Sequence, residues 1–147
     1  MNSQPADIYR VIEITERIHN TIISDFPMPD LPLNQRQVSI LWFVFHHQKS
    51  SINDVARHFY ISKSTASQAV SHLEKEQFLE RTVNPENRRE VILQLLERGR
   101  YWKAQFKEAE RQLHEKYFSK IPQKDVDKMQ EALENIQAIV EKEKSKN

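Results

Sequence analysis

Cysteine is absent from this 147-residue chain, and glycine occurs only once. Without cysteine the chain forms no disulfide, senses no redox change through a thiol and holds no metal through sulfur. The same lack is compatible with a reducing cytoplasm, which is the expected location. A single glycine, together with many Glu, Lys and Gln residues, indicates a mostly helical protein.

Long apolar segments and a strong net charge are missing too. The longest apolar run, Ile40 to Phe45, is far too short to span a bilayer, and the N-terminus lacks the basic-then-apolar pattern of a signal peptide. We therefore expect no membrane partner. Lys and Arg number 22 against 21 acids, a net charge of +1. Any argument for nucleic-acid binding must therefore rest on how charge is distributed.

The stretch from Ser51 to Leu95 has the pattern of a helix–turn–helix followed by two strands. Ser51 and Asp54 fit a capping box at the start of the first helix. Ser62 is a suitable N-cap for the second helix, expected from about Lys63 to Glu76. The apolar residues that recur at helical spacing in this second helix, and must face inward, are Ala66, Ala69, Val70 and Leu73.

The residues on the opposite face of the second helix are of the kind that contacts a DNA groove. No Asp or Glu occurs from Val55 to Leu73, although 29% of the chain is charged, and carboxylates there would be repelled by phosphates. Gln68 can pair bidentately with adenine, and Lys63 can approach phosphate. The alternative is a serine-rich face that is simply solvated. The predicted DNA-binding residues of this region are Arg57, Ser62, Lys63, Ser64, Thr65, Ser67, Gln68, Ser71 and His72.

A two-stranded wing is predicted after the second helix. Its first strand holds Phe78, Leu79 and Val83, and its second holds Val91, Leu93 and Leu95. The polar segment 84–89 between them is expected to be the turn. Arg88 and Arg89 would then lie at a hairpin tip and could enter a minor groove. An ordinary solvated hairpin is the alternative.

Amphipathic helices are predicted on both sides of this region. One runs from about Ala6 to Asp25, a second is capped by Asn34, a third runs from Glu97 to about Ser119, and Pro122 starts the last. The narrow apolar seam of the third consists of Trp102, Phe106, Ala109, Leu113 and Tyr117, and that of the last of Val126, Met129, Leu133, Ile136 and Val140. Such seams are typical of helix pairing between chains. They predict a helical lobe that forms a homodimer, with a folded-back monomer as the alternative.

The chain resembles the multiple-antibiotic-resistance regulator (MarR) family of winged-helix transcription factors. The resemblance is most specific in three segments: Ile52–Ala56, the recognition-helix sequence Ser62–Glu74, and the wing sequence Asn84–Gly99. It implies a mainly α (α+β) fold, with the winged helix–turn–helix at 34–96 and dimerisation helices at 6–33 and 97–147. It also implies a homodimer that binds double-stranded DNA at a pseudo-palindromic operator, usually as a repressor released by a small-molecule effector.

Several residues depart from the family pattern. Asn84 and Asn87 stand where Asp is usual, and the second Asp commonly orients the wing arginine, here Arg89. Gln77 replaces a glycine and would be strained in a left-handed conformation. Leu96 replaces the usual capping Thr. These changes bear on the rigidity of the wing.

Other functions have weaker support in the sequence. The chain has no phosphate loop, nucleophile elbow or zincin helix, so we expect no enzyme and no cofactor. His46 and His47 point in different directions, and scattered surface histidines explain them better than a metal site. A winged-helix dimer that binds protein instead of DNA remains an alternative. Trp42, Phe43, Phe45 and the loop 26–33 could border an effector pocket, although plain core is favoured.

Overall fold

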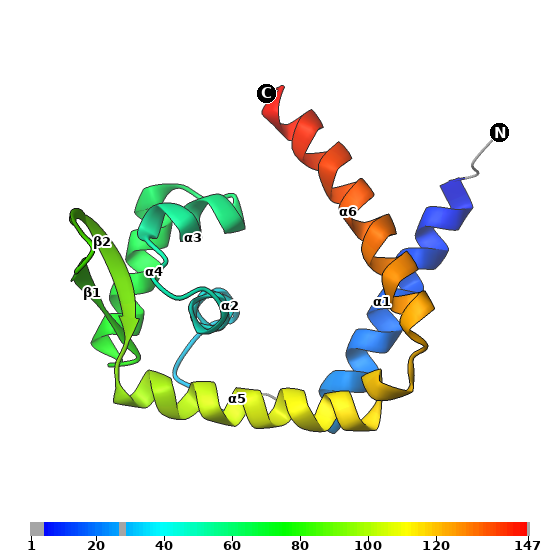
Figure 1. Ribbon diagram of the computed structural model, residues 1–147, viewed down its shortest axis with the longest axis horizontal. Helices are drawn as coiled ribbons and strands as arrows, with labels where there is room; N and C mark the ends of the chain where they lie inside the picture. Colours follow the sequence, from blue (N-terminus) through cyan, green and yellow to red (C-terminus); the bar gives the residue numbers. More distant parts are fainter. Residues whose placement is uncertain (1–4, 27–28, 147) are drawn as a thin grey trace. The chain divides into compact units, whose positions relative to one another are not determined.

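The computed structural model describes residues 5–26 and 29–146. Its α-helices are α1 (Pro5–Asp25), α2 (Gln35–His46), α3 (Ile52–Phe59), α4 (Lys63–Lys75), α5 (Glu97–Lys116) and α6 (Gln123–Ser145), with a 3-10 turn at Phe118–Lys120. Strands β1 (Leu79–Asn84) and β2 (Asn87–Leu95) form an antiparallel sheet. Figure 1 shows α2, α3 and α4 gathered beside this sheet. The predicted mainly helical, winged helix–turn–helix fold is confirmed.

The chain divides into two compact units, residues 1–108 and 109–147. The first contains the winged helix–turn–helix, and the second contains the 3-10 turn and α6. Across residues 5–26 and 29–146, every helix is too short or too polar to cross a bilayer. The functional division into a DNA-binding region at 34–96 and dimerisation helices at 6–33 and 97–147 stays a prediction.

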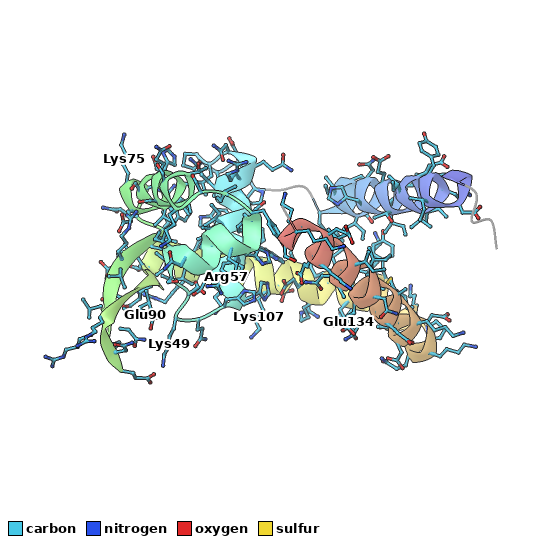
Figure 2. All side chains as sticks on the ribbon, turned by 90° about the horizontal axis from the view of Figure 1, so that it is seen from above. Lys49, Arg57, Lys75, Glu90, Lys107 and Glu134 are labelled. Carbon is cyan, nitrogen blue, oxygen red and sulfur yellow. The ribbon has the colours of Figure 1, made fainter. Side chains whose placement is uncertain are left out.

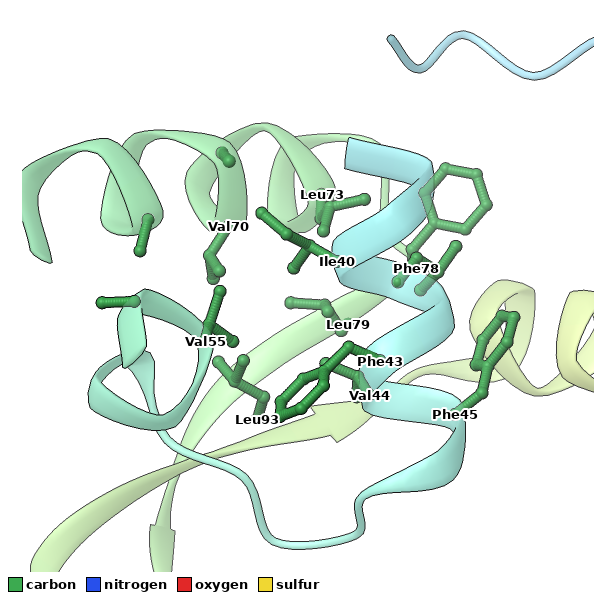
Figure 3. Packing of buried hydrophobic residues seen from close by; sticks show 14 residues of the cluster. Ile40, Phe43, Val44, Phe45, Val55, Val70, Leu73, Phe78, Leu79 and Leu93 are labelled. Atoms are coloured by element: carbon green, nitrogen blue, oxygen red, sulfur yellow. The ribbon is translucent and has the colours of Figure 1, made fainter. Parts of the chain in front are cut away.

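One apolar core holds the winged helix together. Figure 3 shows Ile40 of α2 among side chains from α3, α4 and the sheet, and Ile40, Val55 and Val70 are fully buried. Burial of each such side chain stabilises the fold by roughly 1.5–3 kcal/mol. The other large side chains buried below 2% exposure are Leu41, Leu73, Phe78 and Leu79. This core fixes the position of α4.

The predicted caps of α2 and α3 are present. The Asn34 side chain accepts from the Gln37 backbone N–H at 2.9 Å, and the Gln37 side chain accepts from the Asn34 N–H at 2.9 Å. Asp54 accepts from the Ser51 N–H at 2.8 Å, and Ser51 Oγ accepts from the Asp54 N–H at 3.2 Å. The backbone bond from Ser51 holds the pKa of Asp54 below its usual value. The caps thus fix where α2 and α3 begin.

A tight corner joins α4 to the wing. Gln77 has φ 61°, in the left-handed region. The Phe78 N–H donates to Leu73 O at 2.9 Å and the Gln77 N–H donates to Glu74 O at 2.9 Å. These two bonds make a Schellman motif, which usually has glycine at the left-handed position. Gln77 therefore adopts the conformation that its sequence position predicted, at a cost of about 1–2 kcal/mol relative to glycine.

The only glycine of the chain, Gly99, lies where α5 passes close to this corner. A Cβ added to Gly99 would lie 2.0 Å from the carbonyl oxygen of Phe78. Real Cβ atoms do not approach backbone that closely, so any larger residue would push α5 away. The Leu96 N–H also donates to Phe78 O, at 3.0 Å. Gly99 thus allows α5 to start against the base of the wing.

The predicted wing turn was wrong in its extent. Asn84 pairs with Asn87, so the turn holds only Pro85 and Glu86, and Arg88 and Arg89 belong to β2. Phe78 precedes β1 instead of lying in it. Polar side chains do not prevent backbone pairing, and Asn84 supports the tight turn by accepting the Glu86 N–H at 3.0 Å. The amino-acid sequence alone did not reveal that the turn holds only two residues.

The sheet is irregular just after its turn. Val83 pairs with Val91, whereas the next pair is Asn84 with Asn87. Residues 88–90 of β2 therefore have no counterpart in β1, which makes a bulge. Arg88 and Arg89 lie in this bulge and are exposed. They flank the wing tip without occupying it.

The helical boundaries elsewhere are close to those expected. α5 ends at Lys116 where the prediction continued to about Ser119, because residues 118–120 form a tighter 3-10 turn. Pro122 is the N-cap of α6. Most large apolar side chains of α1 and α6 are exposed. The exposed set on these two helices includes Ile8, Val11, Ile12, Ile18, Met129, Leu133, Ile136, Ile139 and Val140.

Candidate nucleic-acid interface

Helix α4 presents one polar side because its other side is anchored in the core. Ala66, Ala69, Val70 and Leu73 are buried, as predicted. The small side chains of Ala66 and Ala69 allow close packing of α4 within the core. We call the polar side of α4 the reading face and define it by Lys63, Ser64, Ser67, Gln68 and Ser71.

Three residues of the reading face are free to bind a partner. Lys63, Ser64 and Gln68 are exposed. Within the part of the chain that the structure describes, their side chains have no hydrogen-bond or ionic partner. Together they offer a cation, a hydroxyl and an amide that can bond to a base pair edge or to phosphate.

Other predicted contact residues are already engaged within the chain. Ser62 Oγ donates to Thr65 Oγ1 at 2.8 Å and accepts from the Thr65 N–H at 3.0 Å, so this pair caps α4. His72 donates from Nε2 to the Pro32 carbonyl at 3.1 Å. Ser62, Thr65 and His72 therefore position the helix and its neighbouring loop. Pro27 and Met28 of that loop, which the sequence offered as a pocket border, lie outside the described residues.

Arg81 of β1 was missed by the sequence analysis. Its side chain pairs through Nη1 with Glu74 Oε2, and its backbone N–H donates to Glu74 Oε1 at 2.8 Å. Its Nη2 donates to Ser67 Oγ at 2.8 Å and to Ser71 Oγ at 3.3 Å. Arg81 thereby ties the wing to the reading face. The sequence signal is weak, because Glu74 and Arg81 lie on different elements and meet only across the corner at Gln77.

Exposed arginines flank the reading region on the wing and on α3. Arg88 and Arg89 have exposed side chains without a partner among residues 5–26 and 29–146. Asn87 Oδ1 accepts from the Arg89 backbone N–H at 3.3 Å. Asn87 thus bonds to the backbone of Arg89 and leaves the guanidinium free, so it does not replace the aspartate that commonly orients this arginine in the family. Arg57 of α3, labelled in Figure 2, is 78% exposed and lies 3.6 Å from Asp54.

The wing tip is held by two polar contacts that the sequence did not reveal. Asn84 Nδ2 donates to Glu90 Oε2 at 2.9 Å across the bulge. Lys49 Nζ pairs with Glu86 Oε1 at 2.8 Å, which joins the turn to the segment before α3. This contact lowers the pKa of Glu86. Glu86 and Glu90, the two carboxylates nearest the wing tip, therefore have partners that reduce their repulsion of a phosphate backbone.

Histidine side chains gather at the ends of α2 and α3. The rings of Phe43 and His47 stack at a centroid distance of 4.2 Å, and His58 lies 4.6 Å from Phe43. His47 Nδ1 lies 2.9 Å from the Phe43 carbonyl. No set of three or more His, Asp or Glu side chains in the described ranges is arranged to hold a metal ion. These rings extend the core at its edge.

The fold is that of a winged helix–turn–helix protein. The sequence model of the MarR family matches residues 33–91, which cover α2, α3, α4 and most of the wing. Residues 33–91, which are less than half of the chain, are therefore similar to the MarR family. The match includes every residue that the sequence analysis selected for DNA contact.

One curated relative is similar to the chain in sequence. An uncharacterised HTH-type transcriptional regulator of Bacillus subtilis, YwhA, is 34% identical over 82 residues, which are 56% of this chain and 59% of YwhA. The chain thus matches about three fifths of the length of that relative.

Solved structures share the fold over nearly the whole chain. Streptococcus pneumoniae FabT in complex with DNA has a TM-score of 0.69 at 17% identity, covering 91% of this chain and 97% of FabT. A MarR protein from Peptoclostridium difficile has a TM-score of 0.68 at 18% identity, covering 97% and 93%. Staphylococcus aureus MepR in its DNA-binding conformation has a TM-score of 0.65 at 16% identity, covering 93% and 98%.

Proposed function

We propose that this protein is a sequence-specific DNA-binding transcriptional regulator. The observation that carries the proposal is that part of the reading face has no hydrogen-bond or ionic partner among the described residues. Lys63, Ser64 and Gln68 are exposed without partners among the described residues, on a helix anchored by four buried side chains. The helix presents no carboxylate before Glu74, and Glu74 is paired with Arg81. Such a surface suits a major groove.

We further propose that the wing supplies contacts beside the recognition helix. Arg88 and Arg89 are exposed, and the bulge at residues 88–90 sets their backbone apart from the regular ladder. A free guanidinium is well suited to a narrow minor groove, where the negative potential is strongest. FabT, which shares this fold, was solved in complex with DNA. That similarity supports DNA as the partner class.

The functional unit in this proposal is a homodimer. α6 carries the exposed apolar side chains Met129, Leu133, Ile136 and Val140 at the spacing predicted for a helix seam. Exposed apolar stripes of this kind are normally covered by a partner. Two copies would place two reading faces on one duplex, so the operator would be a pseudo-palindrome with half-sites about 10 bp apart.

Repression relieved by a small molecule is the most specific part of the proposal. Its support in this chain is a contact between aromatic side chains of α2 and α5. Trp42 of α2 is 37% exposed and contacts Phe106 of α5 edge-to-face, with ring centroids 5.2 Å apart. Phe43 and Phe45 are buried in the core, in agreement with the preferred sequence interpretation. Among proteins of similar fold, MepR was solved bound to ethidium bromide. A ligand that reaches Trp42 should change its fluorescence and lower operator affinity.

The proposal is tested by selecting bound fragments from random double-stranded DNA with the full chain. Recovery of a sequence with two related half-sites supports sequence-specific binding by a dimer. The affinity for that sequence should then fall steeply between about 50 and 200 mM salt, because counterions are released from the neutralised phosphates. Absence of any binding in dilute buffer would contradict DNA binding. Capture of a protein with salt-insensitive affinity would favour the alternative, a winged-helix dimer that acts through protein contacts.

A further inference from the structure

The guanidinium of Arg81 occupies an unusual position between the wing and the reading face. One edge pairs with Glu74, while Nη2 donates to Ser67 O at 3.0 Å and to Ser67 Oγ at 2.8 Å. The side chains of Arg81 and Glu74 are only 27% and 29% exposed. A partly desolvated guanidinium with several acceptors is held more rigidly than a surface lysine. Arg81 therefore fixes the groups that it touches.

The hydroxyl groups of Ser67 and Ser71 are constrained differently. Ser71 donates its hydrogen to Ser67 O at 2.9 Å and accepts from Arg81 at 3.3 Å, so its donor capacity is used. Ser67 Oγ accepts from Arg81, and its own hydrogen has no acceptor within the described part of the chain. A positive charge beside Ser67 Oγ disfavours the approach of a second donor. Ser67 is thus left as a donor.

We propose that Arg81 is a positioning residue that fixes Ser67 as a hydrogen-bond donor, so that Ser67 selects a base pair edge presenting an acceptor. This inference rests on the proposed function. The edges that fit are the N7 and O6 atoms of guanine, N7 of adenine and O4 of thymine, whereas the cytosine amino group does not fit. Arg81 itself does not contact DNA in this proposal.

Glu74 determines how the proposal must be tested. Removal of Arg81 alone would leave an unpaired carboxylate beside the reading face, and repulsion of phosphates would weaken binding to every sequence. The double change Glu74→Gln with Arg81→Gln removes the guanidinium and the carboxylate together. It leaves the net charge unchanged. The Ser67 hydroxyl then becomes free to donate or to accept.

The experiment repeats the selection from random DNA with the full-length double variant and with Ser67→Ala. Both variants should lose preference at the same base position, and affinity for the wild-type sequence should fall about tenfold. Ser67→Ala added to the double variant should cause little further loss, because both act through one hydroxyl. Ser64→Ala is the matched control: Arg81 does not contact Ser64, so its effect should add to that of the double variant.

Several results would overturn the inference. Unchanged preference at every position in the double variant, with the wild type still selective, would exclude a role for Arg81 in specificity. An equal loss of affinity for all DNA sequences in the Ser67→Ala variant would indicate that Ser67 contacts a phosphate instead of a base. If the double variant fails to fold, Arg81→Lys replaces it in the experiment. A single ammonium cannot pair with Glu74 and donate to Ser67 in the way that the forked guanidinium does. Full wild-type selectivity in Arg81→Lys would contradict the proposal. A wild-type chain that binds no DNA would overturn the proposed function as well.

Discussion

Helices α4 and α6 are both amphipathic, but they differ in the burial of their apolar residues. α4 has 13 residues, and Ala66, Ala69, Val70 and Leu73 are all buried. α6 has 23 residues, and no described side chain on it is buried. The winged helix thus completes its core within one chain, whereas α6 leaves a seam open. The difference indicates that the reading unit is structurally self-sufficient, and we propose that α6 requires a second copy.

The most damaging change should be a charge in the open seam. Leu133→Glu should convert the proposed dimer to monomer, because an unpaired carboxylate in an apolar seam costs about 3 kcal/mol or more. Sedimentation measures the change in mass, and Ala138→Glu, at an exposed position of α6 outside the seam, is the control for one added carboxylate. A Leu133→Glu protein of unchanged mass would remove α6 from the interface.

The next change tests the winged helix, which completes its core within one chain. Helix propensity alone predicts that Gly99→Ala stabilises α5 by roughly 1 kcal/mol. The approach of 2.0 Å to Phe78 O predicts the opposite sign, a loss of about 1–3 kcal/mol. Denaturant unfolding separates the two predictions. Ala104→Gly, at an exposed position of α5, should lose about 1 kcal/mol from propensity alone and serves as the reference.

Removal of a wing arginine should affect DNA and leave the fold intact. Arg89 is exposed on β2, so Arg89→Ala should lower operator affinity about tenfold and leave the proposed dimer intact. Titration of operator binding against salt should also show a smaller slope. Lys107→Ala is the control for loss of positive charge away from the wing. Equal operator affinity for wild type and Arg89→Ala would exclude the wing from binding.

The wing can be examined further through its departure from the family pattern. Asn84 is 7% exposed and donates to Glu90, which an aspartate could not do. Asn84→Asp should therefore destabilise the fold by about 1–2 kcal/mol, and Glu90→Gln should restore most of the loss because its amide can donate to the new carboxylate. Thermal unfolding of the single and double variants measures both effects. Additive losses would show that the two residues do not interact.

The smallest effect is expected at the cap of α3. The N–H of Ser51 lowers the pKa of Asp54, so this interaction stabilises the fold above the usual carboxyl pKa and is lost as pH falls toward the lowered value. Asp54→Asn should cost about 0.5–1 kcal/mol at neutral pH and make stability less sensitive to acid. Unfolding measured from pH 7 to pH 3 tests this. Parallel curves for the two proteins would argue against the cap.

Much of the fold could be predicted because it depends on local patterns. Asn34 and Ser51 are caps whose geometry needs only three neighbouring residues, and both were confirmed. The burial of Val70 and Leu73 follows from helical spacing. Gln77 was expected to be left-handed from its place after α4, and it is. Short-range hydrogen bonds and periodicity decide all of these features.

The rest depends on contacts between distant segments. Arg81 meets Glu74 and Ser67 only after the corner at Gln77 is formed, so its role is invisible in the linear sequence. The register of the wing was also hidden, because the turn depends on the side chain of Asn84. As a result Arg88 and Arg89 were placed at the tip. The DNA contacts of the reading face remain predictions.

The central claim is that two self-sufficient reading units are held on one duplex by an open helical seam. Sedimentation of the full chain with a selected duplex tests it directly, because it measures how many chains bind each DNA molecule. We predict two chains per duplex at half-sites about 10 bp apart, and a dimer in the absence of DNA. A monomer in solution that binds as one chain per duplex, or binds no duplex at all, would contradict the claim.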